Sequence, residues 1–316
     1  EEIKSKIVLE RPYKKWLDTT RKNLRDIPNT NEACPIETTN LKTRSRLFNY
    51  TTEDIQVVVT PMAQNGKEAL GSMGIDTPLA VLSDRPQLIS NYFKQLFAQV
   101  TNPPIDPLRE AVVMSLGVEL GREGSIFKEQ SYLGQRIGLS SPVLSPRKYY
   151  ALKNNEYSEF PVQKFDLNYD PQTESLKQAV QRVCKEVEAS VRGGTVVCIL
   201  SDHSLIEGKL PIHTLMAVGA VHSHLIYTGL RCDTNLVAST GYARDSHHIA
   251  TLIGCGASLV YPYLSYHVLC DLIGSGELLV DVDTAFKQYR KGINKGLLKI
   301  LSKMGISTIA SYRGAL

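Results

Sequence analysis

The sequence predicts an α/β protein whose second half is a parallel array of strands and helices. From Glu174 onward, short stretches that are apolar throughout alternate with amphipathic helical patterns. Glycine-rich breaks, such as Gly193-Gly194 and Gly254-Cys255-Gly256, separate a helix from the strand that follows it. Strands without polar positions are typical of a parallel sheet that is covered on both faces. The chain before residue 171 shows helical periodicity and irregular stretches instead, which predicts a mainly helical first part.

Composition excludes several classes of partner. The 316 residues are 42% hydrophobic and 22% charged, with a net charge of +4 and no Lys/Arg block, so we expect no nucleic-acid or membrane partner. No apolar run approaches the roughly 20 residues that a membrane span needs. Six dispersed cysteines without a C-x-x-C pair indicate free thiols in a reducing compartment, so a cytoplasmic location is expected.

The order of patterns predicts three segments. Residues 1–48 are expected to be a charged helical lead-in followed by a linker rich in helix breakers. Residues 49–316 are expected to form the main domain, with a helical or irregular part over 49–170 and a βα part over 171–316. Within 49–170, apolar residues at helical spacing predict a first helix over Thr52–Met62.

The stretch Tyr92–Arg109 is expected to be a rigid elbow. Apolar residues at three- and four-residue steps predict a helix over Pro86–Val100. The prolines of Thr101-Asn102-Pro103-Pro104 end that helix, and Asp106 can cap another. Thr101 and Asn102 would thus present uncharged polar groups at a fixed bend. A plain connection between two helices is the alternative interpretation.

The βα part should bring polar side chains to one edge. Strands are predicted at 195–200, 234–238, 257–260 and 308–310, and helices at 174–191, 212–227, 246–253, 266–273 and 284–303. Parallel strands carry their functional groups at their carboxyl ends. The segments expected at that edge are Ser201-Asp202-His203, Ser239-Thr240-Gly241, Tyr261-Pro262-Tyr263 and Ser311-Tyr312-Arg313-Gly314. Four strands form either an open sheet or part of a barrel.

No complete catalytic, cofactor-binding or metal-binding set is expected. The seven histidines fall within 65 residues, but none form an H-x-x-x-H pair on one helix face. Asp202-His203 stands beside Ser201 without a G-x-S-x-G elbow, and the glycines of 66–76 lack the phosphate-loop spacings. Arg244 and Arg313 could hold an anion, although pairing with a neighbouring carboxylate is the commoner fate of such arginines.

Several long strings, in order, resemble the central domain of the glutamate synthase large subunit. They are SMGIDTPLAVLSDRP (72–86), NYFKQLFAQVTNPPIDPLRE (91–110), MAVGAVH (216–222), LIGCGASLVYPY (252–263) and GLLKILSKMGISTIASYRGA (296–315). The resemblance implies a degenerate TIM-barrel-like (β/α) domain that connects a glutaminase domain with an FMN domain of the same polypeptide. It also implies that Met73, Thr101 and Asn102 help to line a tunnel for ammonia.

The resemblance places the cofactors outside this chain. FMN and an iron–sulfur cluster are implied for the full-length enzyme, with ferredoxin or a nicotinamide-oxidising subunit as electron donor, in the cytoplasm or a plastid. The fragment itself is expected to be inactive. Two other hypotheses stay open: a self-contained flavin- or phosphate-binding barrel enzyme that uses the edge at Ser201, Ser239 and Ser311, and an interaction scaffold.

Overall fold

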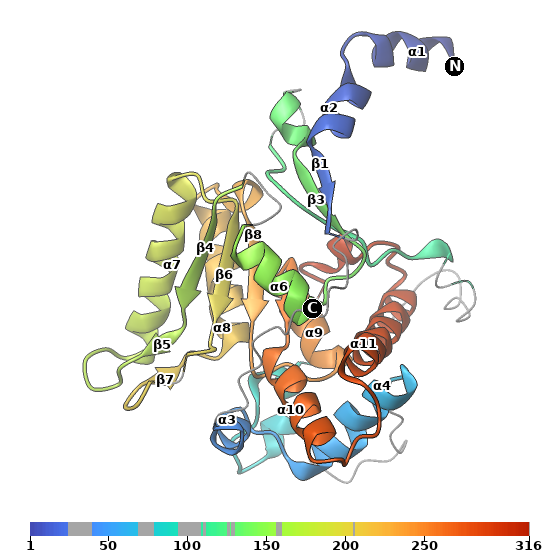
Figure 1. Cartoon of the computed structure of the whole chain (residues 1–316). Helices are drawn as coiled ribbons and strands as arrows, with labels where there is room; N and C mark the ends of the chain where they lie inside the picture. The colour runs from blue at the N-terminus through green and yellow to red at the C-terminus, as the bar shows by residue number, and fades with distance from the viewer. Residues whose placement is uncertain are drawn as a thin grey trace.

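A four-stranded parallel sheet forms the centre of the protein (Figure 1). The computed structural model describes residues 1–24, 40–68, 79–93, 109, 112–124, 127, 130–155, 160–204 and 206–315. The strands, in spatial order, are β4 (Val162–Asp166), β6 (Val197–Ser201), β8 (Asn235–Ser239) and β9 (Leu259–Tyr261). The predicted α/β class with parallel strands is confirmed. Within the described residues, the sheet stays open and does not close into a barrel.

The three inner strands form where the sequence is apolar, and each lies within two residues of its predicted position. Every residue of β6, β8 and β9 is buried. In the register, Ser201 of β6 lies beside Ser239 of β8, which in turn lies beside Tyr261 of β9. The carboxyl ends of the three strands are therefore level, as the sequence predicted for the first three polar segments.

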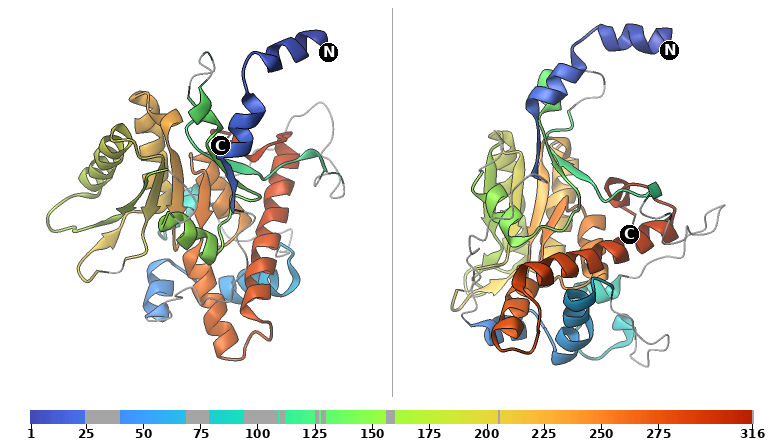
Figure 2. Two further views of the ribbon diagram at one scale, coloured as in Figure 1. Left: turned by 45° about the horizontal axis from the view of Figure 1, so that its top comes forward. Right: turned by 45° about the vertical axis from the view of Figure 1, so that its right-hand side comes forward.

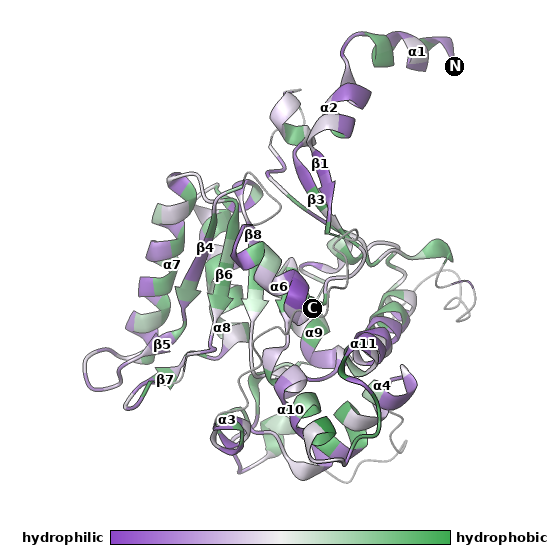
Figure 3. Ribbon diagram, viewed as in Figure 1, coloured by the Kyte–Doolittle hydropathy of each residue, from purple (hydrophilic) through white to green (hydrophobic). Residues whose placement is uncertain are grey.

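Helices follow the strands in the predicted alternation (Figure 1). They are α7 (Leu176–Arg192), α8 (Thr214–Tyr227), α9 (Ser246–Gly254), α10 (Tyr263–Gly274) and α11 (Val282–Met304). Figure 3 shows that α7 alternates between hydrophilic and hydrophobic colours while β6 and β8 are mostly hydrophobic. The apolar stripe of α7 packs on the sheet and on α8, and its polar face meets solvent.

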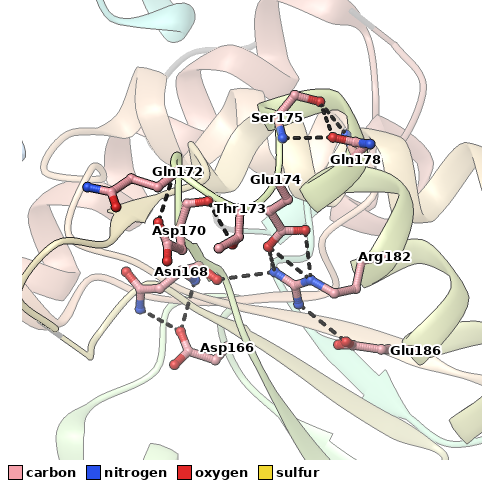
Figure 4. A network of polar contacts seen from close by, with 10 residues as sticks. All are labelled: Asp166, Asn168, Asp170, Gln172, Thr173, Glu174, Ser175, Gln178, Arg182 and Glu186. Carbon is pink, nitrogen blue, oxygen red and sulfur yellow. Dashed lines mark hydrogen bonds and ion pairs between the residues drawn. The ribbon is translucent and has the colours of Figure 1, made fainter.

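The start of α7 is fixed by a polar network (Figure 4). The Ser175 hydroxyl accepts a hydrogen bond from the Gln178 backbone N–H, and the Gln178 side chain accepts one from the Ser175 N–H at 2.9 Å. This reciprocal arrangement is a capping box. Arg182 then pairs with Glu174 at 2.9 Å and donates to the Asn168 carbonyl at 3.2 Å. The network ties the connection that leaves β4 to the first two turns of α7.

The sheet contains one strand that the sequence did not reveal. β4 pairs in parallel with β6, yet it lies before residue 171, in a polar stretch that was interpreted as a boundary. Lys164 and Asp166 are exposed, because β4 is an edge strand with only one strand neighbour. The boundaries placed at residues 48 and 170 stay predictions. A short antiparallel pair is formed by β5 (Asn168–Tyr169), which comes after β4 in the chain, and β7 (Leu210–Pro211), which comes after β6.

The fourth predicted strand, 308–310, is wrong. Thr308 makes a single parallel bridge to Ser115, and the chain then turns into a 3-10 helix, η7 (Ile309–Tyr312). The Gly314 N–H donates to the carbonyl of Gly254 at the end of α9, 2.8 Å away. The end of α9 leads into the start of β9, so it lies at the edge of the sheet where the parallel strands begin. The contact with Gly254 therefore places residues 311–314 at this amino edge. They do not reach the carboxyl edge where they were expected.

The N-terminal part is helical, as predicted, and projects from the body of the molecule (Figures 1 and 2). No residue of α1 is buried. Its elements are α1 (Glu2–Leu9), α2 (Tyr13–Thr20) and a small sheet of β1 (Arg21–Asn23), β3 (Arg136–Leu139) and β2 (Val118–Leu120). Other short helices lie elsewhere along the chain: α3 (Leu41–Leu47), η3 (Ala80–Leu82), η5 (Ser131–Gly134), α6 (Pro146–Lys153) and η6 (Arg231–Asp233).

The helix predicted over Thr52–Met62 is present and packs closely on α11 (Figure 2). It begins as a π-helix, η2 (Asp54–Val59), capped by the Thr51 hydroxyl, and continues as α4 (Thr60–Asn65). Gly292 of α11 permits the approach, because a Cβ there would lie only 3.0 Å from the Met62 side chain.

The helix predicted over Pro86–Val100 is wrong in its described part. Pro86 to Leu88 is not helical, and only a 3-10 helix, η4 (Ile89–Tyr92), follows before Phe93 becomes extended. The His247 ring nitrogen Nε2 lies 2.9 Å from the Ser90 carbonyl, so η4 is held against α9. Residues 94–108, with the expected elbow, lie outside the described residues.

Candidate functional site

The carboxyl edge of the sheet is organised around the carboxylate of Asp202. The Thr214 hydroxyl donates to its Oδ2 at 2.6 Å, and the Thr240 hydroxyl donates to the same oxygen at 2.7 Å. The Gly241 backbone N–H donates to Oδ1 at 3.0 Å. These contacts join the end of β6, the start of α8 and the end of β8. The edge predicted from the sequence is therefore present. The carboxylate of Asp202 at this edge accepts its hydrogen bonds from hydroxyl and backbone groups of the same chain.

Burial changes the chemistry of Asp202. The side chain is fully buried, and this raises its pKa from 3.8 to about 6, even though the hydrogen bonds favour the charged form. A carboxyl group that is enclosed by its own hydrogen-bond donors can hold strand ends together. It does not reach the molecular surface, where it would meet a substrate.

Asp202, His203 and Ser201 do not form a catalytic triad. The backbone N–H of His203, not its ring, donates to the Ser201 hydroxyl at 3.3 Å. The His203 ring instead packs edge-on against Tyr263, with ring centroids 4.5 Å apart, and burial lowers its pKa to about 3. Arg44 of α3 donates to the His203 carbonyl at 2.7 Å. The ring is thus a neutral packing group.

Aromatic rings fill the space beside the strand ends. Tyr149 of α6 stacks on Tyr261 of β9, with centroids 4.0 Å apart and planes inclined by 14°. Burial raises the pKa of Tyr149, and the neighbouring Ser239 and Ser201 side chains oppose that rise. Tyr266 continues the stack and donates to the Leu144 carbonyl at 2.8 Å. Two of the three serines that a flavin- or phosphate-binding barrel was expected to use, Ser201 and Ser239, therefore lie beside a tyrosine of the same chain, whereas Ser311 lies in η7 at the other edge.

A small pocket lies between the starts of α8 and α9 and the 3-10 helix η4. It has room for about one water molecule. The lining residues are Ser90, His213, Thr214, Leu215, Thr240, Tyr242, Ala243, His248, Thr251 and Leu252. It adjoins the Asp202 network, because Thr214 and Thr240 belong to both.

The two arginines considered for anion binding have different fates. Arg244 is buried and pairs with Asp54 at 3.2 Å, donates to the Asn49 carbonyl at 3.0 Å and lies 4.7 Å from the Tyr50 ring centre. It anchors the start of η2 to the βα part. Arg244 thus pairs with a carboxylate of the same chain, which was the alternative to anion binding. Arg313 lies at the amino edge near His222, whose pKa is lowered to about 4 by burial, with smaller contributions from the charges of Arg231 and Arg313.

Three of the histidines contact separate partners. His224 contacts Glu188 at 2.6 Å, His222 accepts from Arg231 at 2.8 Å, and His248 lies 2.7 Å from Asp245. In the part of the chain that the structure describes, no three His, Cys, Asp or Glu side chains are grouped as metal ligands. Over the same ranges, no helix combines the length and the apolarity needed to cross a membrane.

The residues expected from the resemblance, Met73, Thr101 and Asn102, lie outside the described residues, so their tunnel assignment stays a prediction. Sequence reasoning missed Arg44 and Tyr149. Arg44 lies in a polar stretch interpreted as a linker. Tyr149 follows Ser145-Pro146, an N-cap and first-turn pair that signals the start of α6 but gives no sign of the stacking partner.

Comparison with known proteins identifies the family. The profile described as glutamate synthase central domain matches residues 43–316. The large chain of glutamate synthase [NADPH] from Bacillus subtilis is 43% identical over 315 residues, which are 100% of this chain and 20% of the relative. Ferredoxin-dependent glutamate synthase 2 from Arabidopsis thaliana is 40% identical over 99% of this chain and 20% of its own length.

Among solved structures, the flavin-binding domain of baker's yeast flavocytochrome b2 aligns with a TM-score of 0.34 and 15% identity, over 56% of this chain and 38% of that one. Mandelate oxidase aligns with a TM-score of 0.33 and 12% identity, over 59% and 46%. The similarity to the curated relatives is far stronger, and the chain spans about a fifth of their length. The chain belongs to the glutamate synthase central domain family.

Proposed function

We propose that this chain is a non-catalytic central domain of a glutamate synthase. It connects a glutaminase domain and an FMN domain of one polypeptide and helps to wall the path of ammonia between them. The observation that carries the proposal is the match to the central domain over residues 43–316, in relatives about five times as long. The Asp202 network supports an architectural role, because it joins strand and helix ends to each other.

In this proposal, the whole enzyme converts glutamine and 2-oxoglutarate into two glutamates, with electrons from ferredoxin or from a nicotinamide-oxidising subunit. FMN and the iron–sulfur cluster belong to other parts of the polypeptide. Met73, Thr101 and Asn102 line the tunnel. Hydroxyl and amide groups offer hydrogen bonds without fixed charge, and a methionine forms a flexible apolar wall. Such a lining suits ammonia, which must remain unprotonated to react.

The purified chain tests the absence of an independent active site. We expect it to release no ammonia from glutamine and to emerge colourless from a gel-filtration column after incubation with FMN. Glutamine hydrolysis that is lost when one of the chain's own residues is replaced would contradict the proposal. Retention of FMN, lost in a Ser239→Trp variant that obstructs the carboxyl edge, would favour the flavin-binding alternative.

A further inference from the structure

The pocket beside η4 contains polar atoms that the protein does not satisfy. Ser90 is 3% exposed and His248 is 8% exposed. The hydroxyl of Ser90, Nε2 of His213 and Nε2 of His248 are all shielded from solvent, and none has a hydrogen-bond partner among the described residues. All three residues line the same pocket. Buried polar groups without partners cost free energy, so they usually contact an ordered molecule.

The three threonine hydroxyls of the pocket are already engaged as donors. The hydroxyls of Thr214 and Thr240 donate to Asp202, and the hydroxyl of Thr251 donates to the His248 carbonyl at 2.9 Å. No Lys, Arg, Asp or Glu is among the lining residues. Among the lining side chains, the buried polar atoms without any partner in the described residues are thus the Ser90 hydroxyl and the Nε2 atoms of the two histidines.

The hydrogen bonds of His213 define what the guest must offer. Its Nδ1 accepts from the Leu215 backbone N–H at 3.3 Å, so this nitrogen carries no proton. Burial lowers the pKa of His213 to about 4, which keeps the ring neutral at physiological pH. The single ring proton must then lie on Nε2, and Nε2–H is a donor. The guest needs a lone pair to accept this bond, which excludes the ammonium ion.

We infer that Ser90, His213 and His248 form a binding site for one small uncharged molecule of the size of water or ammonia. Nε2–H of His213 donates a hydrogen bond to the guest, and the Ser90 hydroxyl oxygen accepts one from it. His248 Nδ1 lies 2.7 Å from Asp245, which leaves Nε2 of His248 for a further polar contact. The guest links η4 to the starts of α8 and α9. The site stands apart from the proposed function, and only its occupation by ammonia rests on that function.

A crystal structure of the protein, at a resolution that shows ordered water, tests the site. We expect one isolated density peak within hydrogen-bond distance of the Ser90 hydroxyl and of Nε2 of both histidines. Ser90→Val should remove the peak, because a methyl group takes the place of the hydroxyl. Ser265→Ala is the matched control: it also removes a buried hydroxyl, but one that contacts Tyr50 at 2.9 Å and donates to Ala243, so the peak should remain. An empty pocket in the unaltered protein would overturn the inference, even if Ser90→Val failed to fold.

Enzyme kinetics distinguish the two guests. In the full-length enzyme, Ser90→Val should raise the ratio of glutamine hydrolysed to 2-oxoglutarate consumed if the guest is ammonia in transit. An unchanged ratio, together with the crystallographic peak, identifies an internal water. A density peak with the shape and contacts of an anion would contradict the site as inferred, and it would leave the tunnel assignment of Thr101 and Asn102 untouched.

Discussion

The two edges of the parallel sheet each enclose a charged side chain among uncharged partners. At the carboxyl edge, Asp202 accepts hydrogen bonds from two threonine hydroxyls and one backbone N–H. At the amino edge, Arg231 donates to the Thr234 carbonyl at 2.7 Å, the Gly256 carbonyl at 2.9 Å and Nδ1 of His222 at 2.8 Å. Each side chain thereby ties together the ends of neighbouring strands and helices.

The two edges differ in how they respond to pH. Burial raises the pKa of Asp202 to about 6, which lies close to physiological pH. Burial lowers the pKa of Arg231 to about 10, so the guanidinium stays charged at neutral pH. The carboxyl edge should therefore lose stability as the pH rises and its carboxyl group ionises. At the amino edge Arg231 does not titrate in this range, but burial lowers the pKa of its partner His222 to about 4, so that edge should lose stability as the pH falls from 6.5 through about 4. Substitution of Asp202 or Arg231, and measurement of stability across pH, test this contrast.

The largest effect is expected from Asp202→Ala. The change leaves the Thr214 and Thr240 hydroxyls and the Gly241 N–H without an acceptor inside the protein. We expect the free energy of unfolding to fall by on the order of 4 kcal/mol, because each unsatisfied buried group costs about 1–3 kcal/mol. Denaturant unfolding measures this, with the exposed Asp18→Ala as control. A loss no larger than that of the control would show that the network does not hold the edge together.

The second-largest effect is expected in the pH dependence of the free energy of unfolding. Because the folded-state pKa of Asp202 is raised above 3.8, its contribution to stability is fully present below pH 3.8 and is lost as the pH rises through about 6. The expected loss is on the order of 3 kcal/mol. The measurement is the free energy of unfolding of the unaltered protein and of Asp202→Asn across this range. If both profiles had the same slope, Asp202 would not be the group responsible.

A smaller loss is expected at the amino edge. Arg231→Met removes three hydrogen bonds, but Arg231 is only half-buried, so water can reach some of the freed acceptors. We expect a loss of about 2 kcal/mol near pH 8, where His222 is neutral and accepts from Arg231. Arg231→Lys, which keeps the charge but not the planar fork, should recover only part of it. Full recovery by lysine would mean that charge, not hydrogen-bond geometry, matters at this edge.

The same contrast explains what could be predicted from sequence. The inner strands β6, β8 and β9 were predictable because continuous apolar runs leave few alternatives. The edge strand β4 was not, because its exposed positions are polar and resemble a loop. Thr308–Ala310 showed the opposite error: a short β-branched run received one bridge to Ser115 and no strand.

The candidate site was predictable in position but not in its contacts. The βα order placed Asp202, Thr240 and Tyr263 at one edge. That the Asp202 carboxylate binds Thr214 and Thr240, or that Tyr149 stacks on Tyr261, depends on tertiary packing that no local pattern encodes. The pocket beside Ser90 was hidden for the same reason, since its lining comes from segments more than a hundred residues apart.

The central claim is that this chain walls a path for ammonia, and Thr101→Phe in the full-length enzyme tests it most directly. The measurement is the ratio of glutamine hydrolysed to 2-oxoglutarate consumed, compared with the unaltered enzyme and with Thr101→Ser as control. If Thr101 lines the path, a bulky ring should obstruct passage: glutamate synthesis falls and the ratio rises, whereas Thr101→Ser leaves both unchanged. If Thr101 only shapes a bend, overpacking costs about 1–3 kcal/mol of stability and lowers both activities together. An unchanged ratio in a variant with reduced synthesis would contradict the claim.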